Sequence, residues 1–103
     1  MIYLDYSATT PVLPEILNSF NKVCTEYIGN PNSMHSLGIK SKELLNSATK
    51  QIAHVLNIKT NEIIYTSGST ESNNIALIGT AFAKKKQGNH IIVSKLEHES
   101  IYG

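Results

Sequence analysis

One turn, within residues 63–74, constrains the fold of this chain more than any other segment. It reads Ile-Ile-Tyr-Thr-Ser-Gly-Ser-Thr-Glu-Ser-Asn-Asn: a short β-branched and aromatic run, then small hydroxyl residues around one glycine, then a helical pattern. A buried strand that leads directly into a helix is typical of α/β folds. The segment therefore predicts an α/β protein in which Gly68 lies at the turn between strand and helix.

The same turn has the composition of an anion-binding site. Gly68 lets the backbone turn closely, the free N–H groups of a helix start point outward, and the helix dipole favours negative charge there. The hydroxyl groups of Ser67, Ser69 and Thr70 add donors, so a phosphate group is the expected ligand. An ordinary helix start with a serine or threonine cap fits these residues equally well.

Two common phosphate-binding motifs do not fit this turn. A P-loop requires a lysine shortly after its second glycine, and no lysine follows Gly68 within reach. A dinucleotide-binding fingerprint requires three spaced glycines, and the turn has one. The site is therefore neither of these nucleotide cradles.

Composition narrows the class of protein and its partners. The 103 residues make one domain or a piece of one, and a formal charge of +1 gives no electrostatic basis for binding nucleic acid or an anionic membrane. No apolar stretch approaches membrane-spanning length, and the N-terminus lacks a signal-peptide pattern. Cys24 is the only cysteine, which excludes an internal disulfide and fits the cytoplasm.

Hydrophobic periodicity and turn residues predict an extended arm, three helices and two strands. The arm takes residues 1–13, the helices take 14–27, 36–57 and 70–86, and the strands take 62–66 and 89–94. A further helix begins near Glu97 and the chain stops one turn into it, so a truncated protein is expected. The ranges 1–13, 14–57 and 62–103 form the arm, a helical part with a Gly-Asn-Pro loop, and the start of an α/β domain.

The first predicted helix carries an apolar stripe, which predicts one face of a core. Its members are Ile16, Leu17, Phe20, Val23 and Tyr27. Cys24 lies on this stripe, so we expect its thiol to be packed in the core and inert. The run of three lysines at 84–86 lies at a predicted helix end, where cations complement the dipole, and reads as a solvated helix terminus.

Four segments, taken together, carry a family resemblance. They are Tyr-Leu-Asp-Tyr-Ser-Ala-Thr-Thr-Pro at 3–11, Gly-Asn-Pro-Asn-Ser-Met-His-Ser-Leu-Gly at 29–38, the turn segment 64–74, and Glu97-His98. In order and spacing the chain resembles the first quarter of the cysteine desulfurases, pyridoxal-phosphate enzymes of the aminotransferase class V group. The resemblance implies a fold type I (aspartate aminotransferase-like) domain: an N-terminal arm, the opening of the large domain, and an incomplete sheet.

The resemblance also implies roles for particular residues. Ser69 and Thr70 match positions that bind the cofactor phosphate through backbone N–H groups and the threonine hydroxyl. The family more often has alanine where Ser69 stands, and a small residue there preserves the backbone contact. His98 matches the histidine that stacks on the pyridine ring, and His35 lies in a loop near the active site of the dimer, where loop packing explains it equally well.

The other histidines and the lysines match no functional position. His54 and His90 have no counterpart in the family pattern, and the spacing of the four histidines and one cysteine gives no zinc signature, so no metal is expected. All nine basic residues are lysine, so the chain has no arginine for a bidentate grip on a substrate carboxylate. In the family, the cofactor-binding lysine, the acid at the pyridine nitrogen, the substrate arginine and the reactive cysteine lie beyond the position of Gly103.

The expected function follows from the resemblance. The parent enzyme would be a cytoplasmic homodimer that takes sulfur from L-cysteine, giving L-alanine and an enzyme persulfide. It would pass the sulfur to acceptor proteins for iron–sulfur cluster assembly or tRNA thiolation. The 103 residues alone contain no catalytic residue and are expected to be inactive. The alternatives are a selenocysteine lyase or another class V relative, and, in another class, a non-catalytic fragment that only self-associates.

Overall fold

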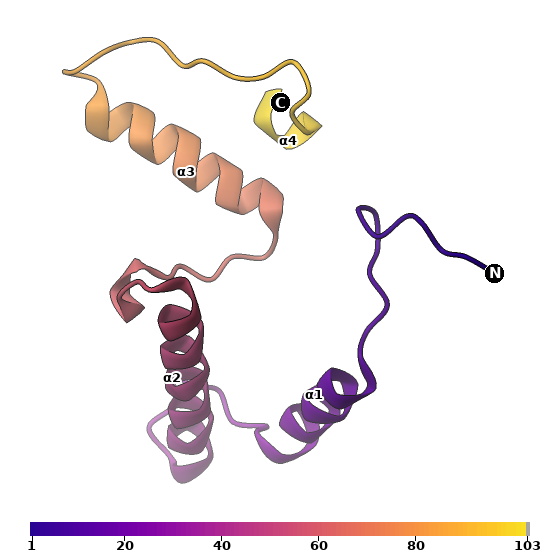
Figure 1. The fold of residues 1–103 in the computed structure, drawn as a ribbon. Helices are drawn as coiled ribbons and strands as arrows, with labels where there is room; N and C mark the ends of the chain where they lie inside the picture. The colour runs from indigo at the N-terminus through magenta and orange to yellow at the C-terminus, as the bar shows by residue number, and fades with distance from the viewer. Residues whose placement is uncertain (103) are drawn as a thin grey trace. The chain divides into compact units, whose positions relative to one another are not determined.

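The computed structural model describes residues 1–102. The chain divides into two compact units, Met1–Ile63 and a second that begins at Ile64, and each is described by itself. Figure 1 shows a helical chain, and residues 1–102 contain no assigned strand. The elements are α1 (Pro14–Glu26), α2 (Ser36–Leu56), the 3₁₀ helix η1 (Thr60–Glu62), α3 (Ser69–Lys84) and α4 (Glu99–Tyr102).

The predicted arm, residues 1–13, contains no helix, but it is not straight. A turn at residues 6–8 folds it back, and the Tyr3 hydroxyl donates to the backbone oxygen of Thr9 at 2.9 Å. The rings of Tyr3 and Tyr6 lie 5.4 Å apart between centroids. The arm is therefore an irregular segment that folds back on itself and is held by hydrogen bonds between nearby residues.

Helix α1 begins at the predicted residue and ends one residue before the predicted end, but its predicted burial is wrong. Pro14 occupies the first turn, and the carboxylate of Glu15 is stabilised by the positive end of the helix dipole, so the helix begins where expected. No residue of α1 is buried, Phe20 is 63% exposed, and Cys24 is exposed. The stripe predicted as core lacks a covering surface within unit 1, because an amphipathic helix buries its apolar face only when another element packs on it.

Helix α2 begins against the Gly-Asn-Pro loop that precedes it. Gly29 and Gly38 allow this approach: a Cβ on Gly38 would lie 2.3 Å from the backbone oxygen of Ser33 and 2.6 Å from that of Asn30. No side chain fits there, because a Cβ essentially never lies closer than 3.0 Å to another heavy atom. This packing fixes the loop predicted at residues 29–33 on the first turn of α2.

The few buried residues of unit 1 belong to α2. They are Gly38, Ser41 and Ala53, and the Ser41 hydroxyl donates to the backbone oxygen of Tyr27 at 3.3 Å. The helix ends at Asn57, whose φ of 54° is left-handed, and the N–H of Ile58 donates to the oxygen of Ala53 at 3.0 Å. Asparagine tolerates this conformation at a helix end, which explains why the predicted bounds, 36–57, are confirmed to one residue.

The two predicted strands are wrong for residues 1–102. Residues 60–62 form η1, and residues 63–66 and 89–94 lack the hydrogen-bonded ladder that defines a strand. An extended segment becomes a strand only when it pairs with a neighbouring strand, and residues 1–102 contain no strand beside either segment. Both segments contain β-branched residues, but the predicted sheet does not form within the described residues.

Unit 2 consists of α3, an irregular return segment and α4. Helix α3 begins one residue before the prediction and ends two residues before it. The chain then turns back, and α4 contacts α3 (Figure 1). The side-chain amide of Asn73 on α3 donates to the Ser100 hydroxyl on α4 at 2.8 Å, and the Tyr102 hydroxyl bonds the backbone oxygen of Ser94. The first bond holds α4 against α3, and the second ties α4 to the return segment.

None of the helices in residues 1–102 combines the length and the apolar character that a transmembrane helix needs.

Candidate functional site

The start of α3 is open, as an anion site requires. Its cap residue is Gly68, which has no side chain to satisfy the helix start, and a Cβ placed there would meet nothing within 4 Å. The first backbone N–H to find an acceptor is that of Ser72, which donates to the oxygen of Gly68 at 3.1 Å. Among the described residues, the N–H groups of Ser69, Thr70 and Glu71 therefore have no acceptor.

Two hydroxyl groups at this helix start are equally free. The structure gives the side chains of Ser69 and Thr70 no hydrogen-bond partner within residues 1–102. Free N–H groups, free hydroxyls and a positive helix end together suit an anionic group such as a phosphate. The alternative of a serine or threonine cap is not what the structure shows, because the cap is glycine and no side chain caps the helix.

Ser67 differs from its two neighbours in the turn. Its backbone N–H and its hydroxyl both donate to the same carboxylate oxygen of Glu71, each at 2.7 Å. The bond from the backbone N–H, followed by the bond from the hydroxyl, holds the pKa of Glu71 below its usual value of 4.5. Ser67, expected as an anion donor, is thus used internally to shape the turn.

Thr66 fixes the other side of the turn. Its hydroxyl donates to the backbone oxygen of Gly68 at 3.1 Å and lies 2.6 Å from the hydroxyl of Ser72. Thr66 and Ser67 therefore use their hydroxyls within the turn. The hydroxyls of Ser69 and Thr70 have no partner within residues 1–102.

His98 lies just before α4 and is tied to α3. Its Nδ1 accepts from the backbone N–H of Ser100 at 3.1 Å and lies 3.0 Å from the Ser100 hydroxyl. That hydroxyl accepts from Asn73, which lies one turn after Thr70 on α3. The three predicted cofactor-binding residues, Ser69, Thr70 and His98, thus belong to one unit, with His98 linked to the helix that carries the other two.

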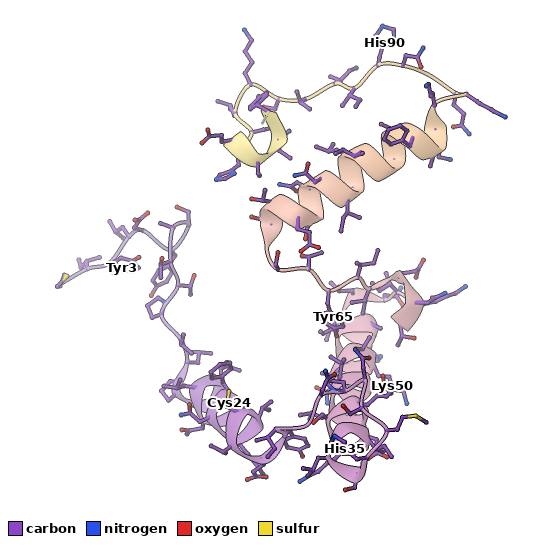
Figure 2. The ribbon with its side chains drawn as sticks, turned by 180° about the vertical axis from the view of Figure 1, so that it is seen from behind. Tyr3, Cys24, His35, Lys50, Tyr65 and His90 are labelled. Carbon is purple, nitrogen blue, oxygen red and sulfur yellow. The ribbon has the colours of Figure 1, made fainter. Side chains whose placement is uncertain are left out.

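The remaining predicted histidine and cysteine positions have other surroundings. His35 caps α2, since its Nδ1 accepts from the N–H of Gly38 at 3.3 Å. His54 and His90 are exposed, and Figure 2 shows His90 on the return segment after α3. Residues 1–102 contain no group of three His, Cys, Asp or Glu side chains that could hold a metal ion.

Two apolar hollows lie along α3, away from the candidate site residues. One of about 570 Å³ is lined by the C-terminal half of α3 and residues 88–91, and one of about 360 Å³ by α3, Ile91, Val93 and the start of α4. Neither is lined by Ser69, Thr70 or His98. The start of α3 is therefore exposed, and the hollows lie where the apolar face of α3 is uncovered.

Sequence reasoning missed three residues of this arrangement. Glu71 lies three residues after the cap Gly68, where a capping box has its acid, but its carboxylate accepts from Ser67 instead of the cap residue. Asn73 and Ser100 are 27 positions apart, and no local signal joins them.

Comparison with known proteins assigns the chain to a family. Residues 2–102 match the family aminotransferase class-V. The chain belongs to that family. The match covers nearly the whole chain and confirms the resemblance carried by the four segments.

The relatives sharpen the comparison. The chain is 50% identical over 101 residues to a NifS/IcsS protein homolog of Lactobacillus delbrueckii subsp. bulgaricus, covering 98% of this chain and 26% of that protein. It is 47% identical over 100 residues to cysteine desulfurase IscS of Clostridium botulinum (strain Kyoto / Type A2), covering 97% and 25%. A solved NifS-like protein superposes with a TM-score of 0.88 at 35% identity over 98% of this chain and 28% of that one. The chain thus spans about a quarter of the length of its relatives.

Proposed function

We propose that this chain is the N-terminal part of a pyridoxal-phosphate-dependent cysteine desulfurase. The family match and the 47% identity to a protein named cysteine desulfurase IscS support this reaction class. The whole enzyme would take sulfur from L-cysteine, leave L-alanine, and deliver the sulfur to acceptor proteins for iron–sulfur cluster assembly or tRNA thiolation. The alternative is a selenocysteine lyase or another class V relative, which would have the same site residues in this quarter of its chain.

The open start of α3 carries the proposal. Ser69 and Thr70 would bind the cofactor phosphate through their backbone N–H groups and the Thr70 hydroxyl, all of which lack acceptors within residues 1–102. His98 would stack on the cofactor ring, and its link to α3 supports this role. When bound, the cofactor supplies an electron sink for the cleavage of bonds at the substrate carbon. The residues of this chain bind and orient it.

The domain plan remains part of the proposal. Residues 1–13 would be an arm, residues 14–57 the first helices with their loop, and residues 62–103 the opening of the fold type I domain, whose sheet needs strands from elsewhere. The complete protein would be a cytoplasmic homodimer. The chain alone would be inactive, because the family's lysine, arginine and reactive cysteine match no position in it, and its one cysteine lies on α1.

A chimera tests the phosphate contact. Residues 2–102 would replace the matching quarter of the Clostridium botulinum relative, and pyridoxal phosphate affinity would be measured by absorbance titration. Thr70→Val keeps the side-chain shape but removes one hydrogen bond to a charged group, which contributes about 1.5–3 kcal/mol, so affinity should fall about ten- to a hundredfold. His98→Ala should also weaken binding and change the absorbance of the bound cofactor, which Thr70→Val should spare.

Thr80→Val is the matched control. Thr80 lies on the same helix, is exposed, and lines the apolar hollow instead of the turn. It should leave affinity unchanged. Parental affinity and absorbance in both Thr70→Val and His98→Ala would contradict the assignment and return the turn to a plain helix start.

A further inference from the structure

One hydrogen bond decides how the ring of His98 is protonated in its neutral form. The backbone N–H of Ser100 can only donate, and it points to Nδ1 of His98 at 3.1 Å. Nδ1 must therefore be the acceptor nitrogen, so the ring hydrogen is on Nε2. The Ser100 hydroxyl, 3.0 Å from the same nitrogen, then acts as a second donor.

A second hydrogen bond links Ser100 to α3 and fixes which way the Ser100 hydroxyl donates. The Ser100 hydroxyl accepts from the side-chain amide of Asn73 at 2.8 Å, which leaves its own hydrogen free to point at His98. Each group thus donates toward the ring: Asn73 to Ser100, and Ser100 to Nδ1. Both Asn73 and Ser100 are partly buried, so water competes less for these bonds than it does at an exposed side chain.

We propose that Asn73 and Ser100 are positioning residues that hold His98 as the Nε2–H tautomer and orient its ring relative to the start of α3. The inference rests on the proposed function for the role of His98 at the cofactor, but not for the hydrogen bonds themselves. A neutral imidazole held this way presents its face to an aromatic ring and keeps Nε2–H as its one free donor. Neither positioning residue needs to touch the cofactor.

The neighbouring asparagine supplies a matched control. Asn74 also lies on α3, but its side-chain amide donates within the helix, to the backbone oxygen of Thr70 at 2.9 Å. Asn73→Ala removes a bond toward Ser100, whereas Asn74→Ala removes one of similar length that stays within α3. A general loss of helix stability would appear in both variants.

Nitrogen NMR of the full 103-residue chain, labelled at histidine, tests the tautomer without any cofactor. His54 and His90 serve as internal references, because both are exposed. The fraction of neutral His98 with hydrogen on Nδ1 should be about three- to tenfold below that of the references, the factor that one or two hydrogen bonds produce. Ser100→Ala and Asn73→Ala should move His98 part of the way toward the references, because the backbone N–H of residue 100 still donates to Nδ1 in both variants. Ser100→Thr and Asn74→Ala should leave the tautomer ratio unchanged.

Either of two results overturns the proposal. The first is a tautomer ratio of His98 in the parent chain that equals the ratio of His54 and His90. A chain in which α4 does not form would give this result too. Alternatively, Asn73→Ala and Asn74→Ala would shift His98 equally.

A double-mutant cycle in the chimera separates this inference from the proposed function. If Ser100 acts through His98, Ser100→Ala should lower pyridoxal phosphate affinity in the parent but have no further effect in His98→Ala. Additive losses would overturn the positioning role. If His98→Ala itself leaves affinity unchanged, the proposed role of His98 fails, while the tautomer measurement still decides the hydrogen bonds.

Discussion

The starts of α2 and α3 follow turns of similar composition, yet they are built differently. At α2 the side chain of His35 caps the helix, and the backbone of the preceding loop fills the space over Gly38. At α3 the cap is Gly68, no side chain caps the helix, and the space beside the glycine is empty. The first start is closed by its own residues, and the second leaves its first N–H groups without an acceptor in residues 1–102.

This difference shows what separates a helix start closed by its own chain from an open one. Both contain glycine, asparagine or serine, so composition alone does not distinguish them. The deciding observations are which N–H groups lack acceptors and whether a Cβ would fit. On both counts the α3 start is the open one of the two.

The largest expected effect comes from matched glycine substitutions. Gly38→Ala would force a Cβ against the backbone oxygens of Ser33 and Asn30, whereas Gly68→Ala meets open space with an extended φ. Overpacking of this kind costs about 1–3 kcal/mol, so amide hydrogen exchange in α2 should accelerate about ten- to a hundredfold in Gly38→Ala. Gly68→Ala should leave exchange in α3 nearly unchanged, and equal effects of the two substitutions would break the comparison.

A smaller effect is expected from the cap of α2. His35→Ala removes the acceptor for the Gly38 N–H and should cost about 0.5–1 kcal/mol, the lower end for lost caps because the bond is long at 3.3 Å. His35→Asn restores a good cap and should recover the loss, as read from amide hydrogen exchange in the first turns of α2. No recovery with asparagine would mean that the imidazole stabilises the loop in some other way.

The smallest effect concerns pH at the start of α3. Because hydrogen bonds from Ser67 hold the pKa of Glu71 below its usual value of 4.5, the contribution of the carboxylate is present above that value. It is lost as pH falls through the lower pKa of the folded chain. The amide proton of Ser67 should therefore titrate with a midpoint below 4.5, and Glu71→Gln should abolish that titration. A midpoint at or above 4.5 would contradict the bond geometry.

Local patterns in the sequence predicted the helices well. Pro14 and the periodic apolar residues set the bounds of α1 and α2, and the turn at Gly68 fixed the start of α3 to within one residue. These features depend on residues three or four positions apart, which a single sequence displays directly. The free donors of Ser69 and Thr70 follow from that correct helix start.

The failures share a different cause. The strands at 62–66 and 89–94 and the buried face of α1 each require a second surface, and periodicity does not reveal whether that surface is present. The link from Asn73 to Ser100 is also non-local, since a return segment of variable geometry separates them. His98 could be proposed from the family resemblance, but its hydrogen bonds could not.

The confinement of burial to α2 has a thermodynamic consequence. Helix α1 buries no residue, so within unit 1 it gains little from packing and behaves close to an isolated helix in equilibrium with coil. The loop around Gly38 and the first turns of α2 form a separate cooperative element, held by backbone contacts. Unit 1 is therefore a mosaic of local equilibria, and a single melting temperature does not describe it.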